Sequence, residues 1–162
     1  MHIWLVAELL FLLALANGTP VILKDILGGR LASPIDGGAH FVDGRPLFGS
    51  SKTIRGIVLS ILITSAGAYL VSHTWKIGAL VGSVAMAGDL FSSFLKRRMN
   101  LPAGGKATGL DQIPESLFPL LVCRTVLPLT VLDIFVAVAI FFFGEKYLSV
   151  LLYHFHLRDR PY

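Results

Sequence analysis

Long hydrophobic segments alternate with polar, glycine-rich loops along this chain of 162 residues. Apolar runs cover about residues 3–23, 55–72 and 77–95. Each is close to the roughly 20 residues that an α-helix needs to cross a bilayer. The short HTWK segment between the second and third runs predicts an antiparallel hairpin of two helices. The pattern therefore predicts transmembrane helices joined by loops of very different length.

The C-terminal apolar region, residues 116–157, is too long for one membrane-spanning helix. Pro128 predicts a break between a shorter fourth span and a long fifth span, because proline lacks a backbone N–H. Glu145 and Lys146 fall within the fifth span. An alternative therefore stays open, in which one kinked fourth helix ends near Phe143 and the tail lies at the outer interface. We favour five spans.

Composition agrees with a membrane protein. Hydrophobic residues make up 54% of the chain and charged residues only 15%, which is far less charge than a soluble domain of this length carries. We therefore predict an all-α, polytopic integral membrane helix bundle that forms one domain over residues 1–162. The net charge of +4 comes mainly from loops flanking the spans, which indicates membrane orientation and phosphate or anionic lipid rather than nucleic acid.

The lysines and arginines predict how the protein lies in the cell membrane, since basic residues favour the cytoplasmic side. With five spans and the N-terminus outside, both long loops face the cytoplasm, together with 11 of the 14 basic residues. These are Lys24, Arg30, Arg45, Lys52, Arg55, Lys96, Arg97, Arg98, Lys106, Arg158 and Arg160.

The third apolar run ends in GDLFSSFLKRR, which places charges next to a hydrophobic segment. Four of its polar side chains share one helical face at positions i, i+3, i+4 and i+7. They are Asp89, Ser92, Ser93 and Lys96. A carboxylate that faces lipid is costly, so this polar stripe is expected to face the bundle interior or a wet cavity. The end of a helix at the basic membrane face is sufficient to explain Arg98.

The two polar loops contain residue types that bind metal and phosphate. In the first, Asp36 and Asp43 flank GGAHFV and are followed by Arg45 and GSSKTIRG. Carboxylates on a glycine-rich backbone suit Mg²⁺, and Gly, Ser, Lys and Thr suit phosphate, although GSSKT lacks the spacing of a Walker P-loop. The second loop adds Lys106, Asp111 and Glu115. For either loop alone, an ordinary turn-rich juxtamembrane segment is a simpler explanation of this composition than a binding site. That explanation does not predict that acids and bases from three segments meet at one membrane face.

The order of these motifs resembles that of membrane-bound CTP-dependent cytidylyltransferases. PIDGGAHFVDGRPLFGSSKTIRG is similar to their loop with D-x-G-A-x-F, then G-R, F-G and S-P-G-K-T-W-E-G. GDLFSSFLKRR resembles their G-D-L-x-E-S-x-x-K-R segment, and Asp111 stands where their D-R-[ILV]-D motif begins. The KD and HGG elements after K-R are replaced by PAGGKATGLDQIPE, and the chain is short. With NGTP after the first span, these differences resemble the CDP-archaeol synthase branch.

The resemblance implies transfer of CMP from CTP to a lipid phosphate, such as 2,3-bis-O-geranylgeranylglycerol 1-phosphate, with release of pyrophosphate and with Mg²⁺ as cofactor. It implies metal binding by Asp36, Asp43, Asp89 and Asp111. Asp89, Asp111, Lys52 and Lys96 become the catalytic residues. The implied substrate-binding residues are Asn17, Arg45, Gly49, Ser50, Ser51, Thr53, Arg55, Ser92, Ser93 and Arg97. The family has an acidic residue near the position of Ser92, where this chain departs from it.

Several alternatives stay open. A bacterial phosphatidate cytidylyltransferase-like activity would use the same loops, and a small transporter subunit would use intramembrane acids for ion movement. The first helix is expected to end before Pro20, so Asn17 either lines the lipid-phosphate site or caps the helix. Glu8 lies inside the first span and is expected to make an interhelical hydrogen bond.

Overall fold

The computed structural model describes residues 1–105 and 107–154, with side chains described as far as Tyr147. Lys106, Arg158 and Arg160, which belong to the predicted cytoplasmic set, lie outside the described residues. The described chain forms five α-helices, and a 3₁₀ turn, η1 (Tyr69–Val71), extends the second. The helices are α1 (Ile3–Leu27), α2 (Ile54–Ala68), α3 (Trp75–Arg98), α4 (Gln112–Cys123) and α5 (Val131–His154). The fold is therefore all-α, as predicted.

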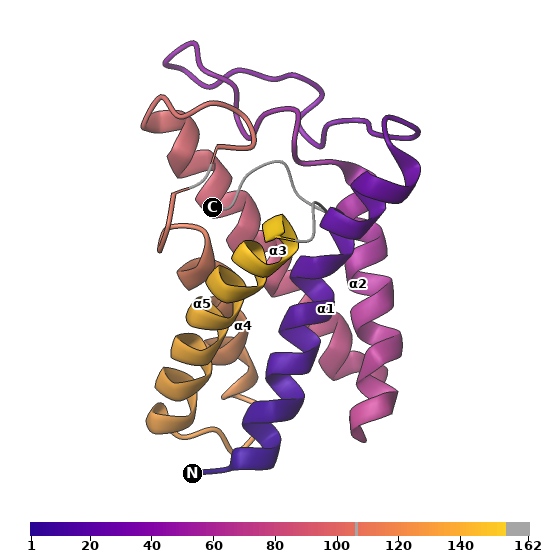
Figure 1. The fold of residues 1–162 in the computed structure, drawn as a ribbon, viewed down its shortest axis with the longest axis vertical. Coiled ribbons are helices and arrows are strands. Elements are labelled where there is room, and N and C mark those ends of the chain that lie inside the picture. Colours follow the sequence, from indigo (N-terminus) through magenta and orange to yellow (C-terminus); the bar gives the residue numbers. More distant parts are fainter. Residues whose placement is uncertain (106, 155–162) are drawn as a thin grey trace.

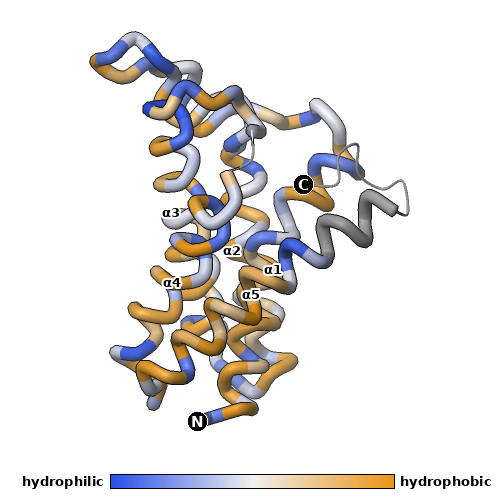
Figure 2. Tube along the Cα trace, turned by 60° about the vertical axis from the view of Figure 1, so that its left-hand side comes forward, coloured by the Kyte–Doolittle hydropathy of each residue, from blue (hydrophilic) through white to orange (hydrophobic). Residues whose placement is uncertain are grey.

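The helices lie along one long axis, with the N-terminus at one end and loop 1 (residues 28–53) at the other (Figure 1). Among the described residues, α1, α2 with η1, and α3 are long and apolar enough to cross a membrane. Hydrophobic residues dominate the part of the bundle nearest the N-terminus, and many hydrophilic residues gather towards the loop end (Figure 2). Leu62, Phe135 and Phe143 are exposed on the surface, as expected of a bundle whose outer surface faces lipid.

The C-terminal region divides into two helices, as Pro128 predicts. Residues 124–130 separate α4 from α5, and α5 continues past Phe143, so the single kinked helix that was to end near Phe143 is not found. Helix α4 has only 12 residues, a length of about 18 Å, and begins about midway along the bundle (Figure 1). Loop 2 (residues 99–111) therefore descends from the loop end towards the bundle centre. Non-helical backbone at membrane depth is tolerated where it lines a polar cavity.

Helix α1 does not end before Pro20, so that prediction was wrong. The helix continues through Pro20 to Leu27, although proline cannot donate the hydrogen bond that the carbonyl of Ala16 would otherwise accept. The hydroxyl of Ser60 on α2 replaces this donor, with Oγ 2.5 Å from the Ala16 oxygen. Ser60 is fully buried. A hydrogen bond from the neighbouring helix thus allows α1 to carry a proline in its interior.

Glycines bring α3 close to its neighbours. A Cβ atom at Gly78 would lie 2.4 Å from the Thr64 carbonyl oxygen of α2, and one at Gly88 would lie 2.5 Å from the Pro114 carbonyl oxygen of α4. Small residues at such positions let membrane helices approach closely and gain packing contacts. Gly88 also precedes Asp89, so the same close approach positions the polar face of α3 against α4.

We expect Gly88→Ala to destabilise the bundle by about 1–3 kcal/mol, because the new methyl group meets backbone that cannot rotate away. Thermal unfolding in detergent measures this change. Gly18→Ala is the matched control, since a Cβ atom at Gly18 meets nothing within 4 Å. Equal unfolding temperatures for the two variants would contradict this account of the α3–α4 contact.

At the N-terminal end of the bundle, a buried carboxylate ties the chain terminus to α5. Asp133 is fully buried and accepts hydrogen bonds from the backbone N–H groups of His2 and Thr130 at 2.9 and 3.0 Å. Thr130 and Asp133 form a capping box at the start of α5. Glu8 pairs with His73 at 3.0 Å, so its contact reaches the hairpin turn rather than another helix. Both acids support the fold far from the loop end.

Candidate active site

Loop 1 is organised around the carboxylate of Asp36. Its oxygens accept hydrogen bonds from the backbone N–H groups of Phe48 and Gly49, each at 2.9 Å, and of Gly38 at 3.0 Å. Burial raises the pKa of Asp36, but these hydrogen bonds outweigh that effect and hold its pKa below the ordinary value. The resulting stabilisation is complete above the pKa of an unfolded aspartate and is lost as pH falls through the lowered folded pKa.

Arg98 fastens loop 1 to the end of α3. Its guanidinium pairs with the carboxylate of Asp43, donates to the Pro46 carbonyl at 2.6 Å and lies 5.0 Å from the ring centroids of Phe41 and Phe94. Such cation–π contacts add to the ion pair. From the sequence, membrane topology alone was sufficient to explain Arg98. The structure shows that its side chain also holds loop 1 against the end of α3.

Beneath the two loops, a cavity of about 600 Å³ opens within the bundle. Its lining residues come from α1, α3, the start of α4, α5 and both loops. Its polar and charged lining residues are Asn17, Ser51, Lys52, Asp89, Lys96, Thr108, Asp111, Gln112, Glu115, Glu145 and Lys146. The predicted convergence of acids and bases from three segments is confirmed for the residues of this cavity.

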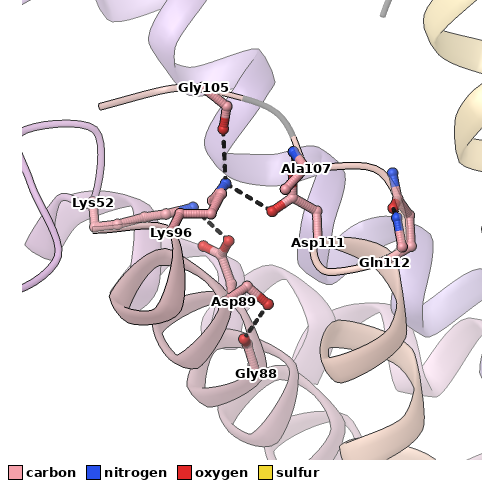
Figure 3. A network of polar contacts seen from close by, with 10 residues as sticks. Lys52, Gly88, Asp89, Lys96, Gly105, Ala107, Asp111 and Gln112 are labelled. Atoms are coloured by element: carbon pink, nitrogen blue, oxygen red, sulfur yellow. Dashed lines mark hydrogen bonds and ion pairs between the residues drawn. The ribbon is translucent and has the colours of Figure 1, made fainter. Parts of the chain in front are cut away.

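Two lysine–aspartate pairs connect the loops to α3 (Figure 3). Lys52 of loop 1 pairs with Asp89 of α3. Lys96 of α3 lies 2.7 Å from an oxygen of Asp111 and donates to the carbonyl of Gly105 at 3.0 Å. Asp111 also accepts a hydrogen bond from the Ala107 N–H at 3.1 Å. The same charged groups therefore shape the cavity and fix both loops above it.

Glu115 lies beside Asp89. The Glu115 side chain is buried and lies close to the carboxylate of Asp89, and Gly88 allows the close helix contact that brings them together. Two neighbouring carboxylates repel each other when both are charged, so a cation between them is strongly favoured. The sequence placed Glu115 in the second loop but did not identify it as a site residue.

The donor set in the cavity fits a magnesium ion. Mg²⁺ is usually bound by one or two carboxylates, and waters and substrate phosphates complete its coordination. Asp89 and Glu115 supply such a pair, and Asp111 lines the same cavity. Within the described part of the chain, no three His, Cys, Asp or Glu residues gather as a complete metal site. Asp36 and Asp43, the other predicted ligands, do not line the cavity and are engaged within loop 1 and by Arg98.

Other predicted site residues support the walls of the site. Thr53 caps α2 by accepting from the Gly56 N–H at 3.3 Å, and Arg55 donates to the Gly28 carbonyl beyond the end of α1 at 2.6 Å. The buried Ser92 donates to the Gly88 carbonyl of its own helix at 2.9 Å. The remaining predicted residues that do not line the cavity are Arg45, Gly49, Ser50, Ser93 and Arg97.

Two of these residues have informative environments. Gly49 has φ +92°, a conformation that glycine adopts at no steric cost, and it lies against the side chains of Arg97 and Ala103. Arg97 is 5% exposed, and its Nε has no hydrogen-bond partner among the described residues. A buried guanidinium of this kind fits an anion, so its role in phosphate binding stays a prediction.

Helix α5 contributes residues that sequence reasoning missed. Phe142, Glu145 and Lys146 line the cavity. In the sequence, the charged pair served only as an argument against a fifth membrane span. The signal was present, because charged residues inside a membrane helix usually face the bundle interior or a water-filled cavity.

These features define a class of protein: an integral membrane helix bundle with a charged cavity inside it, covered by two polar loops. Comparison with known proteins gives the family. The family model described as CarS-like, CDP-archaeol synthase matches residues 2–162. The chain belongs to the CDP-archaeol synthase family.

Individual relatives agree with this assignment. A CDP-archaeol synthase of Pyrobaculum islandicum is 34% identical over 152 residues, which cover 91% of each chain. One from Saccharolobus islandicus is 36% identical over 104 residues, covering 61% of this chain and 59% of that protein. A solved structure, described as an intramembrane enzyme for archaeal membrane lipids biosynthesis, has a TM-score of 0.77 and 29% identity over 88% of this chain and 91% of the other.

Proposed function

We propose that this protein transfers the CMP group of CTP to a phosphorylated archaeal ether lipid, 2,3-bis-O-geranylgeranylglycerol 1-phosphate or a close analogue, in membrane lipid biosynthesis. The products are a CDP-activated lipid and pyrophosphate. The proposal combines family membership with one structural observation. Two lysines from different segments, Lys52 and Lys96, meet carboxylates in a cavity inside a membrane bundle, where a lipid headgroup and a nucleotide can meet.

The chemistry requires alignment and charge neutralisation more than proton transfer. An oxygen of the lipid phosphate forms a bond to the α-phosphorus of CTP, and the bond from that phosphorus to the bridging oxygen of the β-phosphate breaks. The bonding electrons leave with pyrophosphate. Since the attacking oxygen is already an anion, no strong general base is needed. Holding the two phosphates in line supplies much of the rate enhancement.

The residues of the cavity suit these tasks. Lys52 and Lys96 carry the positive charge that phosphates require, and their aspartate partners hold them in place before substrate binds. Asp89, Glu115 and Asp111 would hold Mg²⁺. The ion, when bound, polarises phosphoryl oxygens and offsets the charge of the leaving pyrophosphate. Ser51, Gln112 and Thr108 line the same space and are suited to hydrogen-bond the phosphates or the nucleoside.

We also propose that the N-terminus lies outside the cell and that loops 1 and 2 face the cytoplasm, where CTP is available. The distribution of lysine and arginine supports this orientation. A cysteine introduced as Ser50→Cys should react with a membrane-impermeant maleimide only after the cells are opened. Labelling on intact cells would contradict the orientation.

Pyrophosphate release tests the proposed activity. Purified protein in detergent should release pyrophosphate from CTP only when both Mg²⁺ and the lipid phosphate are present. The corresponding lipid alcohol, which lacks the attacking phosphate, is the matched control and should give no release. Release with the alcohol, or without any lipid, would indicate hydrolysis of CTP rather than transfer to a lipid.

A further inference from the structure

Helix α5 presents polar side chains to the cavity, although the sequence on either side of them is apolar. Phe142, Glu145 and Lys146 occupy positions i, i+3 and i+4 and all line the cavity, as neighbours on one helical face should. Residues 140–143, IFFF, which precede Gly144 and the charged pair, are hydrophobic, and Phe143, which does not line the cavity, is exposed. Lysine in such a helix is costly unless it reaches a polar space, and here the cavity provides that space.

The three lysines of the cavity differ in their partners. Lys52 is paired with Asp89, and Lys96 with Asp111. Lys146 has no carboxylate partner or hydrogen bond among the described residues, although it is exposed and lines the same cavity. Its ammonium group can therefore bind an anion without first breaking an ion pair to any of these residues.

The position of Lys146 distinguishes it from the other two lysines. Lys52 and Lys96 contact carboxylates of α3 and loop 2, whereas Lys146 belongs to α5 and lines the cavity together with Asn17, Pro20 and Val21 of α1. Helices α1 and α5 both have large apolar side chains that are exposed and do not line the cavity, including Ile22 and Phe143. Exposed apolar faces beside the cavity suit a substrate whose tails stay in the bilayer while its phosphate enters the cavity, whereas the polar loops suit the polyphosphate of a nucleotide.

We propose that Lys146 binds the phosphate group of the lipid substrate, and this inference rests on the proposed cytidylyl transfer. The flexible four-carbon stem lets the ammonium follow a phosphate within the cavity. In this arrangement, Lys146 holds the attacking phosphate from α5, and Lys52 and Lys96 hold the phosphates of CTP from the loop side.

Steady-state kinetics of Lys146→Gln, with each substrate varied in turn, test the assignment. Loss of one charge-assisted hydrogen bond should raise KM for the lipid phosphate by about 10- to 100-fold, with KM for CTP within about 2-fold of wild type. Lys146→Arg, which keeps the charge, should recover most of the lipid affinity. Lys76→Gln is the matched control, since Lys76 is an exposed lysine that does not line the cavity, and it should behave as wild type.

The outcomes separate this inference from the proposed function. A wild-type protein without transfer activity refutes the proposed function itself. If wild type is active, an unchanged KM for the lipid phosphate in Lys146→Gln refutes the role of Lys146 alone. A rise in KM for CTP of the same size shows that Lys146 binds nucleotide phosphates, which also overturns the assignment. Unchanged affinity for CTP shows that the variant is folded.

Discussion

Asp89→Asn is expected to lower kcat/KM for cytidylyl transfer by roughly 100- to 1,000-fold. Asp89 connects loop 1 and α4 within the site, because it pairs with Lys52 of loop 1 and lies close to Glu115 of α4. Asparagine has nearly the same shape and can still accept a hydrogen bond from Lys52. It removes the charge that attracts a metal ion, so the fold should persist while the reaction fails.

Initial rates measured over a range of Mg²⁺ concentrations check this prediction. The variant should require far more Mg²⁺ than wild type for any residual rate, and its unfolding temperature should change little. Asp25→Asn provides the control, because Asp25 is an exposed aspartate near the end of α1 that does not line the cavity. Normal activity of Asp89→Asn at low Mg²⁺ would refute the metal-binding role of Asp89.

Lys96→Met is expected to affect both stability and activity. Lys96 is 7% exposed, and its ammonium contacts Asp111 and the Gly105 carbonyl. Removing one partner of a buried ion pair typically costs about 3–5 kcal/mol, because the other charge stays buried and uncompensated. Loop 2 should consequently loosen, which faster cleavage of this loop in limited proteolysis would reveal.

A double variant separates the two roles of Lys96. In Lys96→Met with Asp111→Asn, the uncompensated charge is gone, and the amide oxygen of asparagine can still accept from the Ala107 N–H. We expect the double variant to recover much of the lost stability but none of the activity. Recovery of activity along with stability would mean that the pair only supports the fold.

Much of the fold and part of the site could be predicted from local patterns. Apolar runs of sufficient length predict α1, α2 and α3, and Pro128 predicts the break between α4 and α5. The helical spacing of Asp89 and Lys96 predicts that both face the same side, and both line the cavity. These predictions succeed because hydrophobic length and helical periodicity are properties of one segment alone.

Features that depend on contacts between distant segments could not be predicted in this way. The passage of α1 through Pro20 depends on a hydroxyl from α2, and the role of Arg98 depends on the folding of loop 1 around it. Asp36 resembles a metal ligand in sequence, yet its oxygens accept three backbone N–H groups within its own loop. Glu145 and Lys146 belong to the cavity only because α5 packs beside it, which the sequence of α5 alone does not indicate.

Transfer of isotope from CTP to lipid tests the central claim most directly. Purified protein is incubated with Mg²⁺, the lipid phosphate and CTP labelled with ³²P at either the α- or the γ-phosphate, and the lipids are then extracted. We predict that α-label enters the lipid fraction in proportion to the pyrophosphate released, while γ-label stays in the aqueous phase. Absence of α-label from the lipid, or entry of γ-label, would contradict transfer of CMP to the lipid phosphate.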